Sequence, residues 1–350
     1  MIRRPPRSTL DRSSAASDVY KRQLIANQTS LLHDHLDGGL RPKTIIEIAS
    51  KENIELPTIN EKELAGWFFE NISTKNNQVF NKFALTISLM QKYEYIERIS
   101  YEAVEDLRKD NVENAEIRFA PLQHLNKETS PIEIVKAACA GLIQGEKDFG
   151  GNFNLILCGM RQNNDSVDVA KLAIEAINYK VVGFDLAGPE FNFPPSLHLE
   201  ACHLIRNSDI GLTIHAGEAA DLSYIEDAII NCKAQRIGHG WQIIEGCKQE
   251  GDLFIPNSKI ADIVLDHQIP LEICISSNVK SGASEVSIEN HPAIALLKSG
   301  FKVTLNTDNR LMANTTLSKE FKKAKEFLKL ENLDQELLLK NSYDSLFTNL

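Results

Sequence analysis

The stretch LLHDHLDGG, residues 31–39, places two histidines one residue apart behind a leucine pair and follows them with an aspartate and two glycines. In a β-strand, residues two apart point to the same side, so His33 and His35 share one side if this segment is extended. Two imidazoles at a strand end can chelate a metal ion if other residues complete the site. Otherwise they are an ordinary polar strand end, and the rest of the chain must decide.

Seven further apolar runs, each closing on polar residues, lie between long amphipathic stretches. The eight runs are residues 31–35, 115–119, 153–158, 181–187, 212–216, 236–239, 271–276 and 303–308. The amphipathic stretches include residues 132–142, 167–176, 225–232 and 258–267. Apolar strands that alternate with helices are typical of a parallel sheet covered by helices. Eight such units predict an α/β fold, a single-domain (β/α)8 TIM barrel.

The longest interval between two runs, residues 53–108, separates the first strand from the second and predicts extra helices inserted there. No linker rich in glycine, proline or serine divides the chain after residue 23. A doubly wound open sheet is the structural alternative. A nucleotide-binding sheet of that kind carries G-x-G-x-x-G after its first strand, and HDHLDGGLRP (33–42) does not supply this pattern.

Residues 1–23 differ in composition from the rest, with five arginines and one lysine against two aspartates. They lack the apolar core of a secretory signal, and an organellar transit peptide is the less favoured interpretation of this Arg- and Ser-rich segment. The segment resembles a translated sequencing adapter, so we expect a non-native, disordered leader. The barrel is then expected to occupy residues 24–350, and the apolar end SLFTNL suggests that a few residues are missing there.

The overall composition is that of a soluble globular protein, with 43% hydrophobic and 25% charged residues. No run of 18 or more apolar residues is present, so we expect no transmembrane helix. The formal net charge of −10 opposes binding to nucleic acid or to anionic membranes. Six cysteines without C-x-x-C spacing suit a reducing compartment. We therefore expect a cytoplasmic protein and predict no nucleic-acid, membrane or protein partner.

Polar residues gather at the carboxyl ends of the predicted strands, where the active site of a (β/α)8 barrel lies. These candidates are His33, His35, Glu116, Arg118, Asp185, Gly188, His215, Glu218, His239, Asp308 and Asn309. The other five histidines, His124, His198, His203, His267 and His291, fall mostly on predicted helices or loops. One histidine at a strand end is more often structural than a ligand, but four of them together with Glu218 and Asp308 are hard to explain by coincidence.

Three histidines and an aspartate of this set form a candidate metal site. Imidazole nitrogens and a carboxylate oxygen suit Zn²⁺ and leave a further position open for water. We assign His33, His35, His215 and Asp308 to one zinc ion per chain. Its charge would lower the pKa of a bound water from 15.7 to about 7.

Two more candidates are suited to acid–base chemistry. Glu218 follows His215 by three residues, near enough to face the metal and act as a general acid. The structural alternative for Glu218 is a carboxylate that the helix dipole favours in a first turn. His239 can orient the attacking hydroxide or take its proton.

Taken in order, the motifs resemble those of the adenosine deaminase family, a branch of the amidohydrolase superfamily. They are HDHLDG (33–38), FDLAGPE (184–190), TIHAGE (213–218), RIGHG (236–240) and NTDN (306–309), with AEIRFAP (115–121) and LILCGMR (155–161) at the second and third strand ends. The resemblance implies zinc-dependent hydrolysis of adenosine and 2′-deoxyadenosine, small nucleoside substrates of purine salvage, to inosine products and ammonia. The H-x-E and P-C-x-x-C signature of cytidine-type deaminases is absent.

The resemblance also implies roles for single residues. Glu218 would protonate N1 of the purine, and the amide of Gly188 would reach N3. His239 and Asp308 would hold the hydroxide that attacks C6, and His35 is counted as a substrate contact as well as a ligand.

Two positions bear on the substrate. Asp37 would bind a ribose hydroxyl, whereas relatives that act on adenine often carry glutamate there; its structural alternative is a turn residue before two glycines. Asn309 stands where many members have a second aspartate that contacts purine N7, and its amide can donate without first being protonated. The alternative function is therefore an aminohydrolase of adenine or another 6-aminopurine nucleoside or nucleotide. A non-catalytic nucleoside-binding relative would lack a metal ligand or Glu218, and neither is missing.

Overall fold

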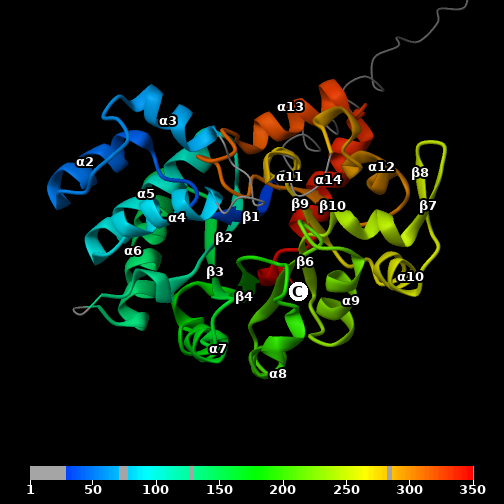
Figure 1. Cartoon of the computed structure of the whole chain (residues 1–350), viewed down its shortest axis with the longest axis horizontal. Coiled ribbons are helices and arrows are strands. Elements are labelled where there is room, and N and C mark those ends of the chain that lie inside the picture. Colours follow the sequence, from blue (N-terminus) through cyan, green and yellow to red (C-terminus); the bar gives the residue numbers. More distant parts are fainter. Residues whose placement is uncertain (1–28, 71–77, 127–128, 282–285, 350) are drawn as a thin grey trace, which may run out of the picture.

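Eight parallel strands form the centre of the computed structural model, which describes residues 29–70, 78–126, 129–281 and 286–349. Their order is β1-β2-β3-β4-β5-β6-β9-β10, and helices surround them (Figure 1). The strands are β1 Ser30–His35, β2 Asn114–Phe119, β3 Asn152–Met160, β4 Val181–Ala187, β5 Gly211–Ala216, β6 Arg236–His239, β9 Leu271–Ile273 and β10 Val303–Leu305. The predicted (β/α)8 barrel is confirmed, whereas the expected leader, residues 1–23, lies outside the described residues.

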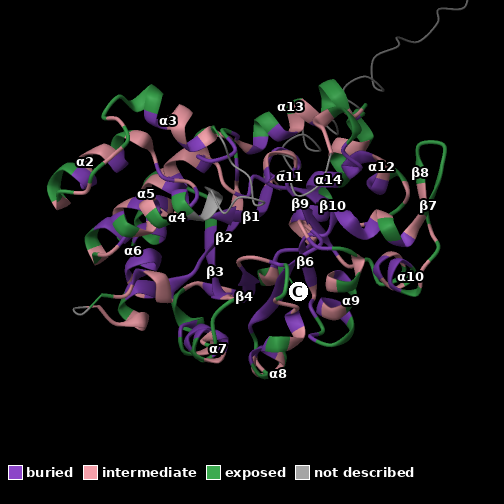
Figure 2. Ribbon diagram, viewed as in Figure 1, coloured by how far each residue is buried: buried purple, intermediate pink, exposed green. Residues whose placement is uncertain are grey.

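The helices on the outside include the insertion predicted after the first strand. Their bounds are α2 Pro42–Glu52, α3 Glu61–Phe69, α4 Gln78–Leu89, α5 Tyr93–Lys109, α6 Pro131–Phe149, α7 Ser166–Glu175, α8 Leu199–Arg206, α9 Leu222–Ile230, α10 Lys259–Asp266, α11 Ile275–Ser281, α12 Ala293–Lys298, α13 Leu317–Phe327 and α14 Asn332–Asp344. Four of them, α2 to α5, lie between β1 and β2. Figure 2 shows buried strands at the centre and exposed residues on the outward faces of the helices.

The barrel closes where the first and last strands meet. A parallel bridge joins Asp34 to Asp308. The backbone N–H of His35 donates to the carbonyl of Asp308 at 2.7 Å, and the N–H of Asp308 donates to the carbonyl of His33 at 2.9 Å. Closure of the barrel therefore places the H-x-H pair of β1 directly beside the aspartate that follows β10.

Two predicted strands are shorter than their apolar runs. The prediction of a strand over residues 271–276 was wrong in its second half, because β9 ends at Ile273 and α11 begins at Ile275. The carboxylate of Glu320, from α13, accepts the backbone N–H of Ser276 at 3.0 Å and so satisfies a donor at the helix start. In the run 303–308 the strand β10 ends at Leu305. A hairpin, β7 Cys247–Glu250 and β8 Leu253–Pro256, was not predicted.

The amino-terminal end of the barrel is filled by a ring from the end of the chain. Gly183 of β4 and Gly211 of β5 are register partners, and a Cβ at Gly211 would lie 2.1 Å from the Phe347 side chain. The backbone N–H of Phe347 donates to Glu116 at 2.6 Å, and the Arg236 guanidinium stacks on the ring at 3.7 Å. The two glycines thus form a slot for the Phe347 ring, because a side chain at either position would clash with it.

Candidate active site

A cavity of about 850 Å³ opens at the carboxyl ends of the strands. Eight of the nine residues named above as ligands, catalytic groups or substrate contacts line it: His35, Asp37, Gly188, His215, Glu218, His239, Asp308 and Asn309. The ninth, His33, is fully buried beside them. The structure therefore brings together every residue to which the sequence assigned a site role.

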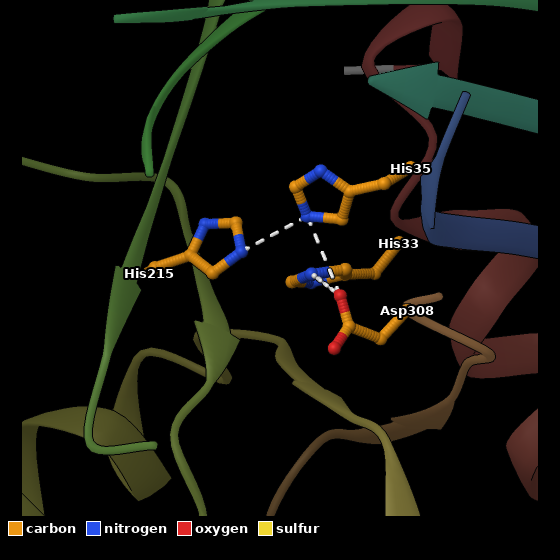
Figure 3. A group of neighbouring side chains, drawn as sticks. All are labelled: His33, His35, His215 and Asp308. Atoms are coloured by element: carbon orange, nitrogen blue, oxygen red, sulfur yellow. Dashed lines mark hydrogen bonds and ion pairs between the residues drawn. The ribbon is translucent and has the colours of Figure 1, made fainter. Parts of the chain in front are cut away.

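Four side chains converge on one point, as Figure 3 shows. His33 and His35 come from β1, His215 from β5, and Asp308 from the segment after β10. The Nε2 atoms of His33 and His35 each lie 3.4 Å from Asp308 Oδ1, and the Nε2 atoms of His35 and His215 are 3.3 Å apart. All four ligand atoms lie within 4.8 Å of one another.

These distances fit a metal ion. Nitrogen and oxygen ligands about 2.0–2.1 Å from zinc, at tetrahedral angles, are roughly 3.3 Å apart. Burial lowers the pKa of His33 to about 4, so this ring is neutral and its nitrogen carries a free lone pair. His33 Nε2 is buried without a hydrogen-bond partner. A buried lone pair that faces other acceptors is costly unless a cation satisfies it, so the four residues fit a divalent metal.

Two buried carboxylates orient the histidines from behind, as is usual for metal-binding histidines. Glu272 lies 3.0 Å from Nδ1 of His33, and Asp185 lies 2.8 Å from Nδ1 of His215. Each contact directs the Nε2 of its histidine toward the shared point. The sequence offered Asp185 as a strand-end candidate without this role, and it gave no role to Glu272.

Arginine side chains in turn hold these carboxylates ionised. Arg118 contacts Glu272 at 2.7 Å and Asp185 at 2.9 Å, and Arg236 contacts Glu272 at 2.7 Å. Burial alone would raise the pKa of Glu272, but the two arginines hold it well below its ordinary value. The charge network therefore extends from the amino-terminal end of the barrel, where Arg236 stacks on Phe347, to two of the candidate metal ligands, His33 and His215.

Glu218 lies beside the four ligand residues. Burial raises its pKa above the ordinary value of 4.5, against the opposing effect of His239. The Oε2 atom of Glu218 is 3.6 Å from Nε2 of His239. Glu190, from the FDLAGPE motif, fixes the loop that carries Glu218 by accepting the backbone N–H groups of Ala219 and Ala220 at 2.6 Å each. Glu190 was not singled out from the sequence, although its motif was.

The backbone itself is unusual at two site residues. His239 has φ 62° and Asp308 has φ 57°, the left-handed region that residues with a Cβ adopt infrequently. Such conformations persist where the surrounding structure imposes them, often at active sites. At Gly188, which has φ 97°, a Cβ would lie 2.4 Å from the side chain of Gln162. Glycine at this position, directly after β4, therefore avoids both a strained backbone and a clash with Gln162.

The other two predicted substrate contacts face the same cavity. Asp37 is 3% exposed, and burial raises its pKa to about 7. Its carboxylate is 3.8 Å from the ring of His35 and 3.9 Å from that of His124. Asn309 has its Oδ1 buried without a partner, and Gly38 leaves room for that amide because a Cβ there would lie 2.0 Å from it.

A (β/α)8 barrel with three histidines, an aspartate and a half-buried glutamate around one cavity defines an amidohydrolase-type enzyme. The family model for adenosine deaminase matches residues 29–349, and the chain belongs to this family. The adenosine deaminase of Mycobacterium marinum (strain ATCC BAA-535 / M) is 44% identical over 298 residues, covering 83% of this chain and 82% of that protein. That of Mycobacterium avium (strain 104) is 43% identical over 302 residues, with the same coverage. The protein is therefore a hydrolytic deaminase.

Solved structures share the fold. An adenine deaminase from Arthrobacter aurescens superimposes with a TM-score of 0.77 at 24% identity, covering 90% of this chain and 92% of that one. An amidohydrolase from Burkholderia ambifaria, with bound Zn, gives 0.78 at 19% identity, covering 93% and 87%. Among the described residues, no helix is long and apolar enough to span a membrane.

Proposed function

We propose that this enzyme uses one zinc ion to hydrolyse adenosine and 2′-deoxyadenosine to inosine and 2′-deoxyinosine, with release of ammonia. The observation that carries the proposal is the convergence of His33, His35, His215 and Asp308 within 4.8 Å at the wall of a cavity that also holds Glu218. Relatives named adenosine deaminase, at 43–44% identity, support the substrate. We further propose that the enzyme acts in the cytoplasm on this small molecule alone.

Zinc is the metal that the donor set favours, since three imidazoles and one carboxylate are borderline-hard ligands. The Burkholderia ambifaria amidohydrolase that shares the fold is described with bound Zn. When bound by the four residues, zinc would lower the pKa of a coordinated water to about 7. The remaining chemistry belongs to side chains of the chain itself.

Glu218 is the proposed general acid. Its raised pKa keeps the carboxyl protonated at a higher pH than an ordinary glutamate. Giving that proton to N1 of the purine would leave C6 short of electrons, so that water adds to C6. One proton of that water would pass to the N6 amine, which leaves as ammonia when the C6–N6 bond breaks. The other would return to Glu218, which restores the acid. His239, within 3.6 Å of Glu218, would hold the attacking oxygen.

Three residues would position the nucleoside. The backbone N–H of Gly188 would donate to N3, and the amide of Asn309 would donate to N7. Asp37 would accept a hydrogen bond from a ribose hydroxyl. All three line the cavity that holds Glu218. One carboxylate oxygen of Asp37 is buried without a hydrogen-bond partner, which suits an acceptor for a hydroxyl group.

A substrate panel tests the proposal. Adenosine, 2′-deoxyadenosine, adenine and AMP are each incubated with the enzyme, and the products and ammonia are quantified by chromatography. We expect turnover of the two nucleosides and little of adenine or AMP. Turnover of adenine without adenosine would overturn the role of Asp37 and favour the alternative aminohydrolase; the Asp37→Asn variant, expected to raise KM more than it lowers kcat, is the matched comparison.

A further inference from the structure

The ring of His239 contacts a residue on the side that faces away from the cavity. Its Nδ1 lies 2.8 Å from the side-chain nitrogen of Asn278, on α11. His239 is fully buried, and its Nε2, on the cavity side, makes no hydrogen bond to described residues. The protonation of Nε2 is thus set by what happens at Nδ1, because a neutral imidazole carries one proton.

A backbone amide three contacts away from His239, that of Ala293, determines which nitrogen carries the proton. The N–H of Ala293 donates to Nδ1 of His291 at 3.2 Å. A backbone N–H can only donate, so this nitrogen must present its lone pair. Burial lowers the pKa of His291 to about 3, which leaves the ring neutral with its single proton on Nε2.

The contact between His291 and Asn278 fixes the orientation of the Asn278 side-chain amide. Nε2 of His291 lies 3.3 Å from Oδ1 of Asn278, and this N–H must donate to an oxygen. The two ends of an asparagine amide are usually assigned from such networks, and here the oxygen faces His291 while the NH₂ faces His239. An amide NH₂ donates, so Nδ1 of His239 accepts.

We propose that Asn278 and His291 are positioning residues that hold His239 in the tautomer with its proton on Nε2. This inference deepens the proposed function and rests on it for its catalytic meaning. His239 then presents a hydrogen-bond donor to the cavity, not an acceptor. Of the two roles considered for His239, orienting the attacking oxygen fits this tautomer, and taking a proton from it does not.

Neither residue was assigned to the site from the sequence. His291 was set aside with the histidines of helices and loops, and it follows a short 3-10 helix, Ile288–Asn290. Its ring packs near Trp241, with ring centroids 5.8 Å apart. The indole N–H of Trp241 donates to the carbonyl of Glu218 at 3.2 Å, so the same cluster supports the loop of the general acid.

The tautomer can be measured directly. We would record long-range ¹H–¹⁵N correlation spectra of the zinc-loaded enzyme with ¹⁵N-labelled histidine, and assign His239 from the signal missing in His239→Gln. The proposal requires an unprotonated Nδ1 and a protonated Nε2 in the resting enzyme at neutral pH. A protonated Nδ1 would overturn it, and this result does not depend on which substrate the enzyme uses.

A variant of Asn278 tests whether this residue sets the tautomer of His239. In Asn278→Asp the ionised carboxylate can only accept, so His239 should move its proton to Nδ1, and kcat should fall by roughly 10²-fold, within the range of general acid–base effects. KM should change by less than about threefold because Asn278 does not line the cavity. Asn341→Asp, a buried asparagine of α14 that donates to the carbonyl of Val303, is the matched control and should leave the His239 spectrum and kcat unchanged.

Two outcomes of the variant contradict the proposal. If the His239 spectrum of Asn278→Asp is unchanged, Asn278 does not set the tautomer of His239. If the spectrum changes and kcat does not, the tautomer does not matter for catalysis. His291→Phe checks the role of His291 independently. Removing its Nε2–H donor frees the Asn278 amide to rotate, so the ¹⁵N signal of an unprotonated Nδ1 in His239 should weaken. If adenosine is not consumed while the spectrum shows the expected tautomer, the proposed substrate is wrong and the proposed positioning of His239 by Asn278 and His291 still holds.

Discussion

Glu218 illustrates how the environment of one side chain suits it to the role of general acid that we propose. Burial disfavours the charged form of the carboxyl and raises its pKa, and the nearby charges of Asp308 and Glu190 act in the same direction. His239 opposes them. A carboxyl meant to deliver a proton near neutral pH needs this balance, since an ordinary glutamate has already lost its proton there.

Replacing the acid tests its role. Glu218→Gln keeps the size and polarity of the side chain but has no proton to give, so we expect kcat to fall about 10²- to 10⁴-fold. Zinc content and the affinity for inosine should stay near those of the wild type. Near-normal turnover would remove Glu218 from the reaction.

The pH profile of the same residue has a defined sign. The active form is the protonated one, so kcat should be constant below the pKa of Glu218 and fall tenfold per pH unit as the pH rises above it. Because the pKa is raised, this loss begins at a higher pH than the ordinary value of 4.5. The residual activity of Glu218→Gln should lack this alkaline decline; a decline that survives in the variant belongs to another group.

At the level of elements, the sequence predicted strand positions better than strand ends. An apolar run shows where a strand lies, but LEICIS continues smoothly from β9 into α11, and periodicity over six residues cannot separate a strand from a helix start. The helix begins there because Glu320 caps it across 44 residues of sequence. The hairpin β7–β8 was missed because it has no buried run: its residues are exposed or half-buried.

The slot for Phe347 gives a test at this scale. Gly211→Ala introduces a Cβ 2.1 Å from the Phe347 side chain, and overpacking of this kind costs about 1–3 kcal/mol of unfolding free energy. Gly66→Ala in α3 is the matched control, because its Cβ would meet only a side-chain atom at 4.0 Å. It should stabilise by roughly 0.5–1 kcal/mol, as alanine does in helices. Chemical denaturation of both variants checks the pair; equal stabilities would show that Phe347 does not fill the slot.

Across the whole molecule, the residues that face the cavity could be predicted from the sequence, and the buried residues behind them could not. The residues that face the cavity stand at strand ends, and the barrel rule brings strand ends together. Glu272, Asn278 and His291 act through contacts with distant residues; Glu272 and His33 are 239 positions apart. Only a folded barrel shows that these buried polar residues meet. The single glutamate inside an apolar run was nevertheless a usable sign for Glu272.

Metal binding should stabilise the entire barrel, since the proposed ligands come from β1, from β5 and from the segment after β10. A ligand that binds only the folded state adds about 2.7 kcal/mol when its free concentration is a hundredfold above Kd. A chelator should therefore lower Tm of the wild type, and of Glu218→Gln by a similar amount. His33→Ala should respond little. An unchanged wild-type Tm after verified zinc removal would contradict a metal that bridges these strands.

The most direct test of zinc-dependent adenosine deamination is a zinc titration of metal-free enzyme, with the absorbance loss of adenosine as the readout. We expect no turnover without metal, a linear rise to one zinc per chain, and no further gain beyond it. His33→Ala should show no such rise. Full adenosine turnover by metal-free protein, or restored metal with no adenosine turnover, would contradict zinc-dependent adenosine deamination.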